Sequence, residues 1–157
     1  MPRNRLKLAP NESSMQKRAT RPKKRKRASK VKSVSNLIKE ADAVFSQYIR
    51  RKYADRDGMV KSFTGNEVKH WKQMHCGHYL SRMYKAMRWD EDNARPQSMA
   101  ENIWKHGNPI EFRINLVAEI GEDRVKALEA KRHGVFRSTR EHIQGIIDHY
   151  KALLETL

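Results

Sequence analysis

One segment of the sequence collects the side chains that can take part in chemistry. It runs through His75-Cys-Gly-His-Tyr-Leu-Ser-Arg82 and Arg88-Trp-Asp-Glu-Asp-Asn-Ala-Arg-Pro-Gln97, and it ends with Asn102 and the pair Gly107-Asn108. A neutral imidazole accepts a proton near pH 7, a carboxamide oxygen can bind Mg²⁺, and a guanidinium can engage two phosphate oxygens at once. These residue types suit metal-assisted acid–base chemistry on a phosphate, so this segment is the candidate functional site.

Composition limits both the architecture and the partners. The chain has 157 residues and a formal net charge of +16, which leaves room for one modest domain and favours polyanionic partners. No run approaches the roughly eighteen apolar residues of a membrane span, and the first residues lack the apolar stretch of a secretory signal. Cys76 is the only cysteine, so no internal disulfide is expected, which suits a reducing cytoplasm. We expect a soluble intracellular protein that does not enter a membrane.

Residues 1–34 are expected to form a basic disordered tail. Residues 1–32 contain thirteen Lys or Arg and a single acid, Glu12, with almost no large apolar side chains. A basic run in this tail is expected to bind DNA by neutralising phosphates; its members are Lys23, Lys24, Arg25, Lys26 and Arg27. A solubilising tail or a nuclear-import signal has the same composition, and the run does not discriminate between these readings.

Residues 35–157 are expected to form one folded domain of class α+β. Ser35 or Asn36 would cap its first helix, and an irregular stretch is expected from Cys76 to Gln97. The other expected elements are a hairpin of Met59–Phe63 and Val68–Met74, a short helix at Ser98–Lys105, a helix from a cap at Asn108 to a stop at Gly121, a helix at Glu122–Lys131, and a last helix opened by the capping box Ser138–Glu141.

Two sets of apolar residues are expected in the core. The helix after Asn108 should bury a stripe of four residues, Ile110, Ile114, Val117 and Ile120. The tryptophans are expected in the core rather than as base-stacking platforms, and they are Trp71, Trp89 and Trp104. The apolar stripe of the last helix, which ends at Leu157, is either a core face or a dimer contact.

The chemistry-bearing segment resembles the NinG/Rap family of phage recombination nucleases. The resemblance rests on a Cys-Gly-His-Tyr box at Cys76, an Arg-Trp-Asp-x-Asp-Asn box that ends in Gln97, and Asn102 followed by Gly107-Asn108. It extends over roughly Ala41 to the C-terminus, since Tyr48-Ile-Arg-Arg51 and the segments around Pro109 and Ile120 also match. Several boxes in the same order make this resemblance specific.

The resemblance implies an HNH, or ββα-metal, endonuclease fold in which a hairpin and a helix surround one divalent ion. It implies that His78 is the general base and that Asn102 binds Mg²⁺ or Mn²⁺. It further implies that Asn93 fixes the loop and orients His78 through hydrogen bonds. Hydrolysis of a phosphodiester needs a base, a cation to offset the charge of the transition state, and help for the departing oxygen.

Basic residues around the implied site are expected to contact DNA phosphates. They are Arg82, Arg88, Arg95 and Lys105. Each of them has an alternative reading as a solvated surface charge. Asp90 and Asp92 would either hold a second ion or shape the loop, and we favour loop shaping.

One departure from the family pattern concerns zinc. The resemblance implies two Cys-x-x-Cys pairs that hold a structural zinc, and Ser62, Gly65, Ser98 and Glu101 occupy those positions here. Zinc needs four nitrogen or sulfur ligands of a kind that Ser and Gly do not offer. A replacement site could be drawn from His70, His75, Cys76 and His106, but their spacings match no established zinc pattern, so we expect no structural zinc.

The expected function is metal-dependent cleavage of DNA in the cytoplasm or nucleoid of the host cell. The resemblance implies branched recombination intermediates, such as Holliday junctions or D-loops, as the substrate. It also allows a homodimer and recombination proteins of phage or host as partners. Two rival readings are a catalytically inactive architectural DNA-binding protein and an RNA- or ribosome-binding protein.

Overall fold

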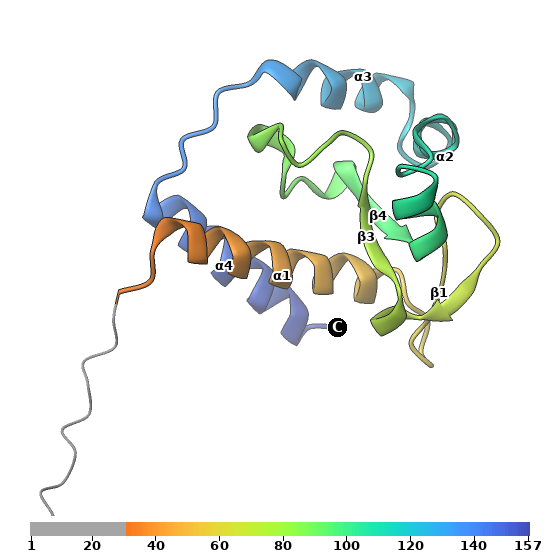
Figure 1. The fold of residues 1–157 in the computed structure, drawn as a ribbon, viewed down its shortest axis with the longest axis horizontal. Helices are drawn as coiled ribbons and strands as arrows, with labels where there is room; N and C mark the ends of the chain where they lie inside the picture. Colours follow the sequence, from red (N-terminus) through yellow and green to blue (C-terminus); the bar gives the residue numbers. More distant parts are fainter. Residues whose placement is uncertain (1–30) are drawn as a thin grey trace, which may run out of the picture. The chain divides into compact units, whose positions relative to one another are not determined.

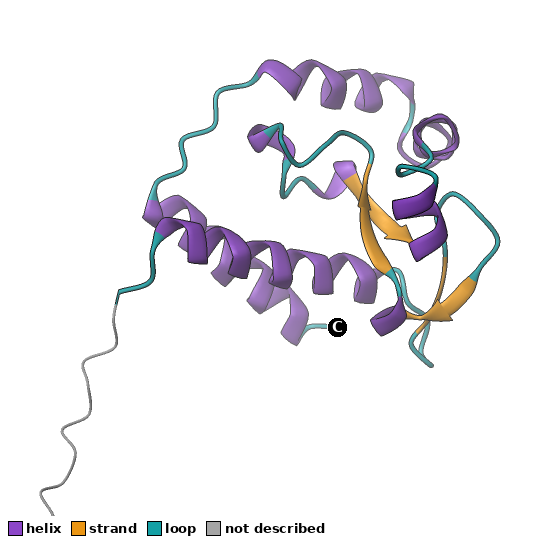
Figure 2. Cartoon of the chain, viewed as in Figure 1, coloured by secondary structure: helices purple, strands orange, loops and turns teal. Residues whose placement is uncertain are grey.

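The computed structural model describes residues 31–157, and within them the expected α+β class is confirmed (Figure 1). The predicted disordered tail, except for residues 31–34, lies outside the described residues, as does the basic run from Lys23 to Arg27. Two small antiparallel sheets and several helices make up the described part (Figure 2). None of the helices in residues 31–157 is long and apolar enough to cross a membrane.

Helix α1 (Val34–Lys52) lies side by side with the last helix, α4 (Arg140–Glu155). Ser33 caps α1, because its Oγ accepts a hydrogen bond from the N–H of Asn36 at 3.2 Å. The predicted cap, Ser35 or Asn36, was therefore two or three residues too late. Between the helices lies one of the two hydrophobic clusters, whose fully buried members include Phe45, Ile49, Ile143 and Ile147.

Helix α4 begins one residue later than the proposed capping box implies. Thr139 is the cap, and its Oγ1 accepts from the N–H of His142 at 3.2 Å. The expected apolar stripe is buried at Ile143, Ile147 and Tyr150 and reaches the surface at Leu157. The reading of this stripe as a core face is thus confirmed for the part that packs on α1.

The predicted hairpin is confirmed by β1 (Met59–Lys61) and β2 (Val68–His70), which pair antiparallel with Met59 opposite His70. A second sheet was not predicted. Strands β3 (His75–His78) and β4 (Ala94–Gln97) pair antiparallel, with His78 opposite Ala94. The expectation of an irregular stretch was wrong here, because β4 contains a proline and a charged residue and lacks the alternation that indicates a strand.

Helices α2 (Pro109–Ile120) and α3 (Glu122–Ala130) meet at Gly121, whose φ of +86° favours glycine. The predicted stripe of α2 was wrong at Ile110 and Ile114, which are exposed. Phe112 and Leu116 are buried instead, and the ring of Phe112 packs on that of Phe63 at 4.8 Å. Both faces of α2 carry apolar residues, so its spacing alone did not select the inner one.

A five-residue π-helix, Ala100–Trp104, replaces the predicted short helix at Ser98–Lys105. Its widened turn is closed by the N–H of Lys105, which donates to the carbonyl of Ala100 at 3.0 Å. The tryptophan prediction holds for buried Trp89 and fails for Trp104, which is 69 % exposed. The π-helix therefore carries a large aromatic side chain on its outer side.

The packing of α1 on α4 predicts a difference between two isoleucines. Ile147→Ala, in the fully buried cluster, should lower the free energy of unfolding by about 2–5 kcal/mol, since it leaves a cavity. Ile110→Ala, at a position that is 73 % exposed, should change it by less than about 0.5 kcal/mol. Urea unfolding of both variants measures this difference, and equal effects would contradict the described core.

Candidate functional site

A cavity of about 760 Å³ contains both His78 and Asn102. Its walls come from α1, from β3 with the residues around it, and from the turn of Asn102 to Gly107. Other side chains that line it include Asp42, Arg50, Lys72, His75, Arg82 and His106. The two residues that the family resemblance implies for base and metal ligand thus share one cavity.

His78 is a neutral imidazole in this cavity. It lies at the end of β3, and its ring packs on Phe45 with 6.0 Å between the ring centroids. Burial lowers the pKa of His78 from its ordinary value to about 4. Its Nε2 lies 3.1 Å from the carbonyl oxygen of Arg88, and because a carbonyl only accepts, Nε2 carries the proton. Nδ1 is then the nitrogen with a free electron pair.

Asn93 closes the loop that carries the hydrogen-bond partner of His78. Its fully buried carboxamide accepts from the N–H of Leu80 at 2.8 Å. It also donates to the carbonyls of Leu80 and Met87, at 2.9 and 3.1 Å. Asn93 does not line the cavity. It acts on His78 indirectly, because it holds the loop whose Arg88 carbonyl contacts the His78 ring.

Asn102 is held by His75, to which the sequence analysis gave no part in the predicted nuclease site. The Nδ2 of Asn102 lies 3.2 Å from the Nδ1 of His75, so the amide donates and the ring accepts. Among residues 31–157, no hydrogen bond engages the Oδ1 of Asn102. One indication was present in the sequence, since His75 begins the segment that contains His78.

Three cations of the cavity lack a carboxylate partner within residues 31–157, and they are Arg50, Lys72 and Arg82. Sequence reasoning missed both Arg50 and Lys72, because Lys72 lies outside the matching segments and Arg50 was matched only as part of Tyr48–Arg51, with no role assigned to it. The Nη1 of Arg50 donates to the carbonyls of Trp71 and Met74, at 3.2 and 3.3 Å. The cavity thus carries positive charge that is not neutralised by neighbouring acids.

Three of the four basic residues that were expected to contact phosphates do not line the cavity of His78. Arg88 forms a two-point ion pair with Asp42 of α1, with Nε–Oδ1 at 2.8 Å and Nη2–Oδ2 at 2.5 Å. Arg95 is buried and donates to Glu119 and to the carbonyls of Glu91 and Ala94. Lys105 is exposed on a neighbouring cavity. Of these four predicted phosphate contacts, only Arg82 lines the cavity of His78.

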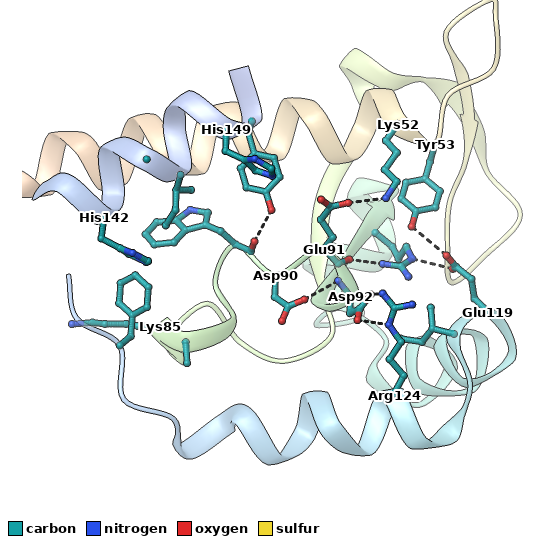
Figure 3. A pocket seen from close by; sticks show the side chains of 18 of the residues that line it. Lys52, Tyr53, Lys85, Asp90, Glu91, Asp92, Glu119, Arg124, His142 and His149 are labelled. Atoms are coloured by element: carbon teal, nitrogen blue, oxygen red, sulfur yellow. Dashed lines mark hydrogen bonds and ion pairs between the residues drawn. The ribbon is translucent and has the colours of Figure 1, made fainter. Parts of the chain in front are cut away.

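A larger cavity of about 900 Å³ contains the acidic residues of the loop (Figure 3). Asp90 pairs with Lys131 at 2.7 Å and Asp92 pairs with Arg124 at 2.6 Å. The carboxylate of Asp90 also accepts from the N–H of Asp92 at 3.0 Å. These contacts agree with loop shaping by the two aspartates, and no group of three or more metal-binding side chains of His, Cys, Asp or Glu occurs in residues 31–157.

Ser62, Gly65, Ser98 and Glu101 lie together, at one place in the fold. Ser62 donates from its Oγ to the buried carboxylate of Glu101 and accepts from the N–H of Ser98 at 2.9 Å. A Cβ on Gly65 would overlap with the Oε1 of Glu101. Hydrogen bonds therefore join the β1–β2 turn to the π-helix at this point.

The fold and the site define a small α+β protein with a cavity that is lined by cations, a neutral histidine and an asparagine. The model of the family described as the Bacteriophage Lambda NinG protein matches residues 3–157, and the chain belongs to that family. It is 31 % identical over 128 residues to Protein ninG of Escherichia phage 933W and 30 % identical over 128 residues to that of Escherichia phage lambda.

Protein ninG of Salmonella phage P22 is 32 % identical over 130 residues. These alignments cover 81 % of this chain and 60–61 % of the relatives, so the chain spans about three-fifths of the length of the curated relatives it matches. No solved structure matches the fold.

The packing of Glu101 against Gly65 predicts a coupling between the two positions. Gly65→Ala should lower stability, because the added methyl group displaces the carboxylate from Ser62. In the Glu101→Ala background the same change should cost little, which gives a coupling energy above roughly 1 kcal/mol in a double-mutant cycle. Gly145→Ala, whose Cβ would meet nothing within 4 Å, is the control and should not destabilise. Additive effects of the two changes would contradict the contact.

The low pKa of His78 predicts a loss of stability in acid. The unfolded chain protonates this ring near its ordinary pKa of 6.5, whereas the folded chain does so near 4. The free energy of unfolding therefore falls as the pH decreases from about 6.5 to about 4, where this effect ends. His78→Gln should lose less stability over this interval in urea unfolding. An NMR titration midpoint of the His78 ring near 6.5 would contradict its burial.

Proposed function

We propose that this chain is a metal-dependent DNA endonuclease in which His78 activates water and Asn102 helps to bind a divalent cation. The observation that carries the proposal is that both side chains line one cavity whose cations lack acidic partners in the described residues. A cavity of positive charge attracts a phosphodiester, and a neutral imidazole inside it can accept a proton from water.

The donor set fits one divalent ion that keeps several of its waters. Asn102 offers a carboxamide oxygen and His75 lies beside it with an imidazole. Oxygen ligands suit both Mg²⁺ and Mn²⁺, so we propose that one of these ions binds at the carboxamide oxygen of Asn102 with waters as further ligands, and that there is no structural zinc. When bound, the ion would offset negative charge on the phosphate in the transition state.

The residues of the chain have separate tasks in this proposal. The carbonyl of Arg88 holds the proton of His78 on Nε2, so that Nδ1 takes the proton of the attacking water. A phosphate beside His78 raises the pKa of the ring through its negative charge, which strengthens the base where the substrate lies. Arg82 and Lys72 bind phosphate oxygens at the edge of the cavity.

The proposed substrate and partners are inferred from the family resemblance. We propose branched recombination intermediates as substrates, in the cytoplasm or nucleoid of the host cell. Contacts with other recombination proteins and pairing of two copies on a symmetric junction belong to the same proposal. The basic run from Lys23 to Arg27 would add salt-sensitive affinity for any DNA.

Cleavage assays with matched variants test the proposal. The full chain should cleave a four-way junction in Mg²⁺ or Mn²⁺ and not in EDTA. His78→Ala should lower the cleavage rate by roughly 10²–10⁴-fold, the contribution expected of a general base. Asn102→Ala should raise the Mn²⁺ concentration required, whereas Asn102→Asp, which keeps an oxygen ligand, should restore cleavage at low Mn²⁺.

The controls are an exposed histidine and an exposed asparagine away from the cavity, and His133→Ala and Asn66→Ala serve this purpose. Both should cleave as the unchanged protein does. Cleavage that survives His78→Ala and Asn102→Ala would remove the proposed site. Metal-independent binding without cleavage by the unchanged protein would assign it to an architectural role instead.

A further inference from the structure

Three apolar side chains stand exposed on the turn that carries Asn102. Met99, Ile103 and Trp104 have exposed fractions of 44 %, 50 % and 69 %. We refer to these three residues as the apolar ridge. A tryptophan usually contributes much of its area to a core or an interface, and within residues 31–157 the side chain of Trp104 is largely uncovered beside two other exposed apolar residues, which suits contact with a partner.

Residues of the π-helix and of the turn after it line two different cavities, and one of these cavities is the candidate site. Asn102 and His106 line the cavity of His78. Glu101 and Lys105 line a different cavity, formed with the β1–β2 turn. The apolar ridge lines neither of these cavities, but Ile103 directly follows Asn102 in the chain, so the ridge adjoins a residue of the cavity in which we place the phosphate.

The backbone after the π-helix holds the ridge outward. His106, Gly107 and Asn108 follow one another with φ values of 51°, 84° and 48°. The N–H of Gly107 donates to the carbonyl of Glu101 at 2.9 Å. Non-glycine residues with left-handed φ cost free energy, and such conformations concentrate at functional sites.

The charges around the ridge fit a nucleic acid rather than a second copy of this chain. Lys105 on the same turn, and Lys72 and Arg82 across the cavity, have no acidic partner within residues 31–157. Two copies docked through this face would bring these like charges together. Aromatic side chains beside cations are typical of surfaces on which unpaired bases stack.

We propose that the apolar ridge, mainly through the ring of Trp104, stacks on an unpaired base of DNA, and that the phosphate next to this base lies in the cavity of His78. This inference rests on the proposed function and deepens it. A base can reach the ridge only where stacking is interrupted, so the ridge would select DNA with a branch point or a single-stranded segment over continuous duplex.

Binding in EDTA tests the ridge separately from cleavage. The probes are a labelled four-way junction and a linear duplex of the same sequence. Trp104→Ala should weaken binding to the junction roughly tenfold or more, as expected for the loss of one stacked base, and should leave duplex binding nearly unchanged. Trp104→Phe keeps an aromatic face and should retain most of the preference. Ile110→Ala, an exposed apolar residue on α2, is the matched control and should bind as the unchanged chain does.

A base analogue at the branch point gives a direct signal. The fluorescence of 2-aminopurine placed there should change when the unchanged protein binds and should not change with Trp104→Ala. An equal loss of affinity for junction and duplex, or no loss, would overturn the inference. Conversion of a dimer to a monomer by Trp104→Ala, measured by sedimentation, would also overturn it by assigning the ridge to a second copy. Cleavage that survives His78→Ala would refute the proposed function without changing this binding result.

Discussion

The closure of one loop by a buried carboxamide is the constraint on which the site depends. The side chain of Asn93 uses its oxygen and its nitrogen on the backbone of Leu80 and Met87. These bonds hold together the two ends of the excursion between β3 and β4, and they place the carbonyl of Arg88 against the ring of His78. Burying an amide group without hydrogen-bond partners costs free energy, so the Asn93 side chain keeps these bonds and thereby fixes the path of the loop. Through the carbonyl of Arg88, the loop in turn fixes the tautomer of His78.

Ion pairs divide the basic residues of the described chain into two groups. Arg88 and Arg95 are engaged by Asp42 and Glu119 and hold α1, the loop and α2 in place. Arg82 and the other cations of the His78 cavity lack such partners in the described residues. The second group is the one available to a phosphate, since its charge is not already offset by a carboxylate.

The sequence predicted the elements with regular spacing and the segment that lines the candidate site. Helix α1 has its apolar residues at helical spacing, and the β1–β2 turn has a turn sequence at Thr64-Gly65-Asn66. Strand β4 escaped detection because its burial comes from tertiary contacts around Arg95, which an alternation pattern does not record. The burial of Arg95 and the exposure of Trp104 also depend on tertiary contacts, so the sequence pattern did not predict them.

The central claim is that Asn102 binds a divalent cation in the same cavity that holds the base His78, and paramagnetic broadening by Mn²⁺ measures this without reference to catalysis. In NMR spectra of the isotope-labelled full chain, with and without bound DNA, substoichiometric Mn²⁺ should first broaden the side-chain amide signals of Asn102 and the ring signals of His75 and His78. Broadening that begins at Asp90 and Asp92 instead, with the Asn102 and His78 signals unaffected, would contradict the account.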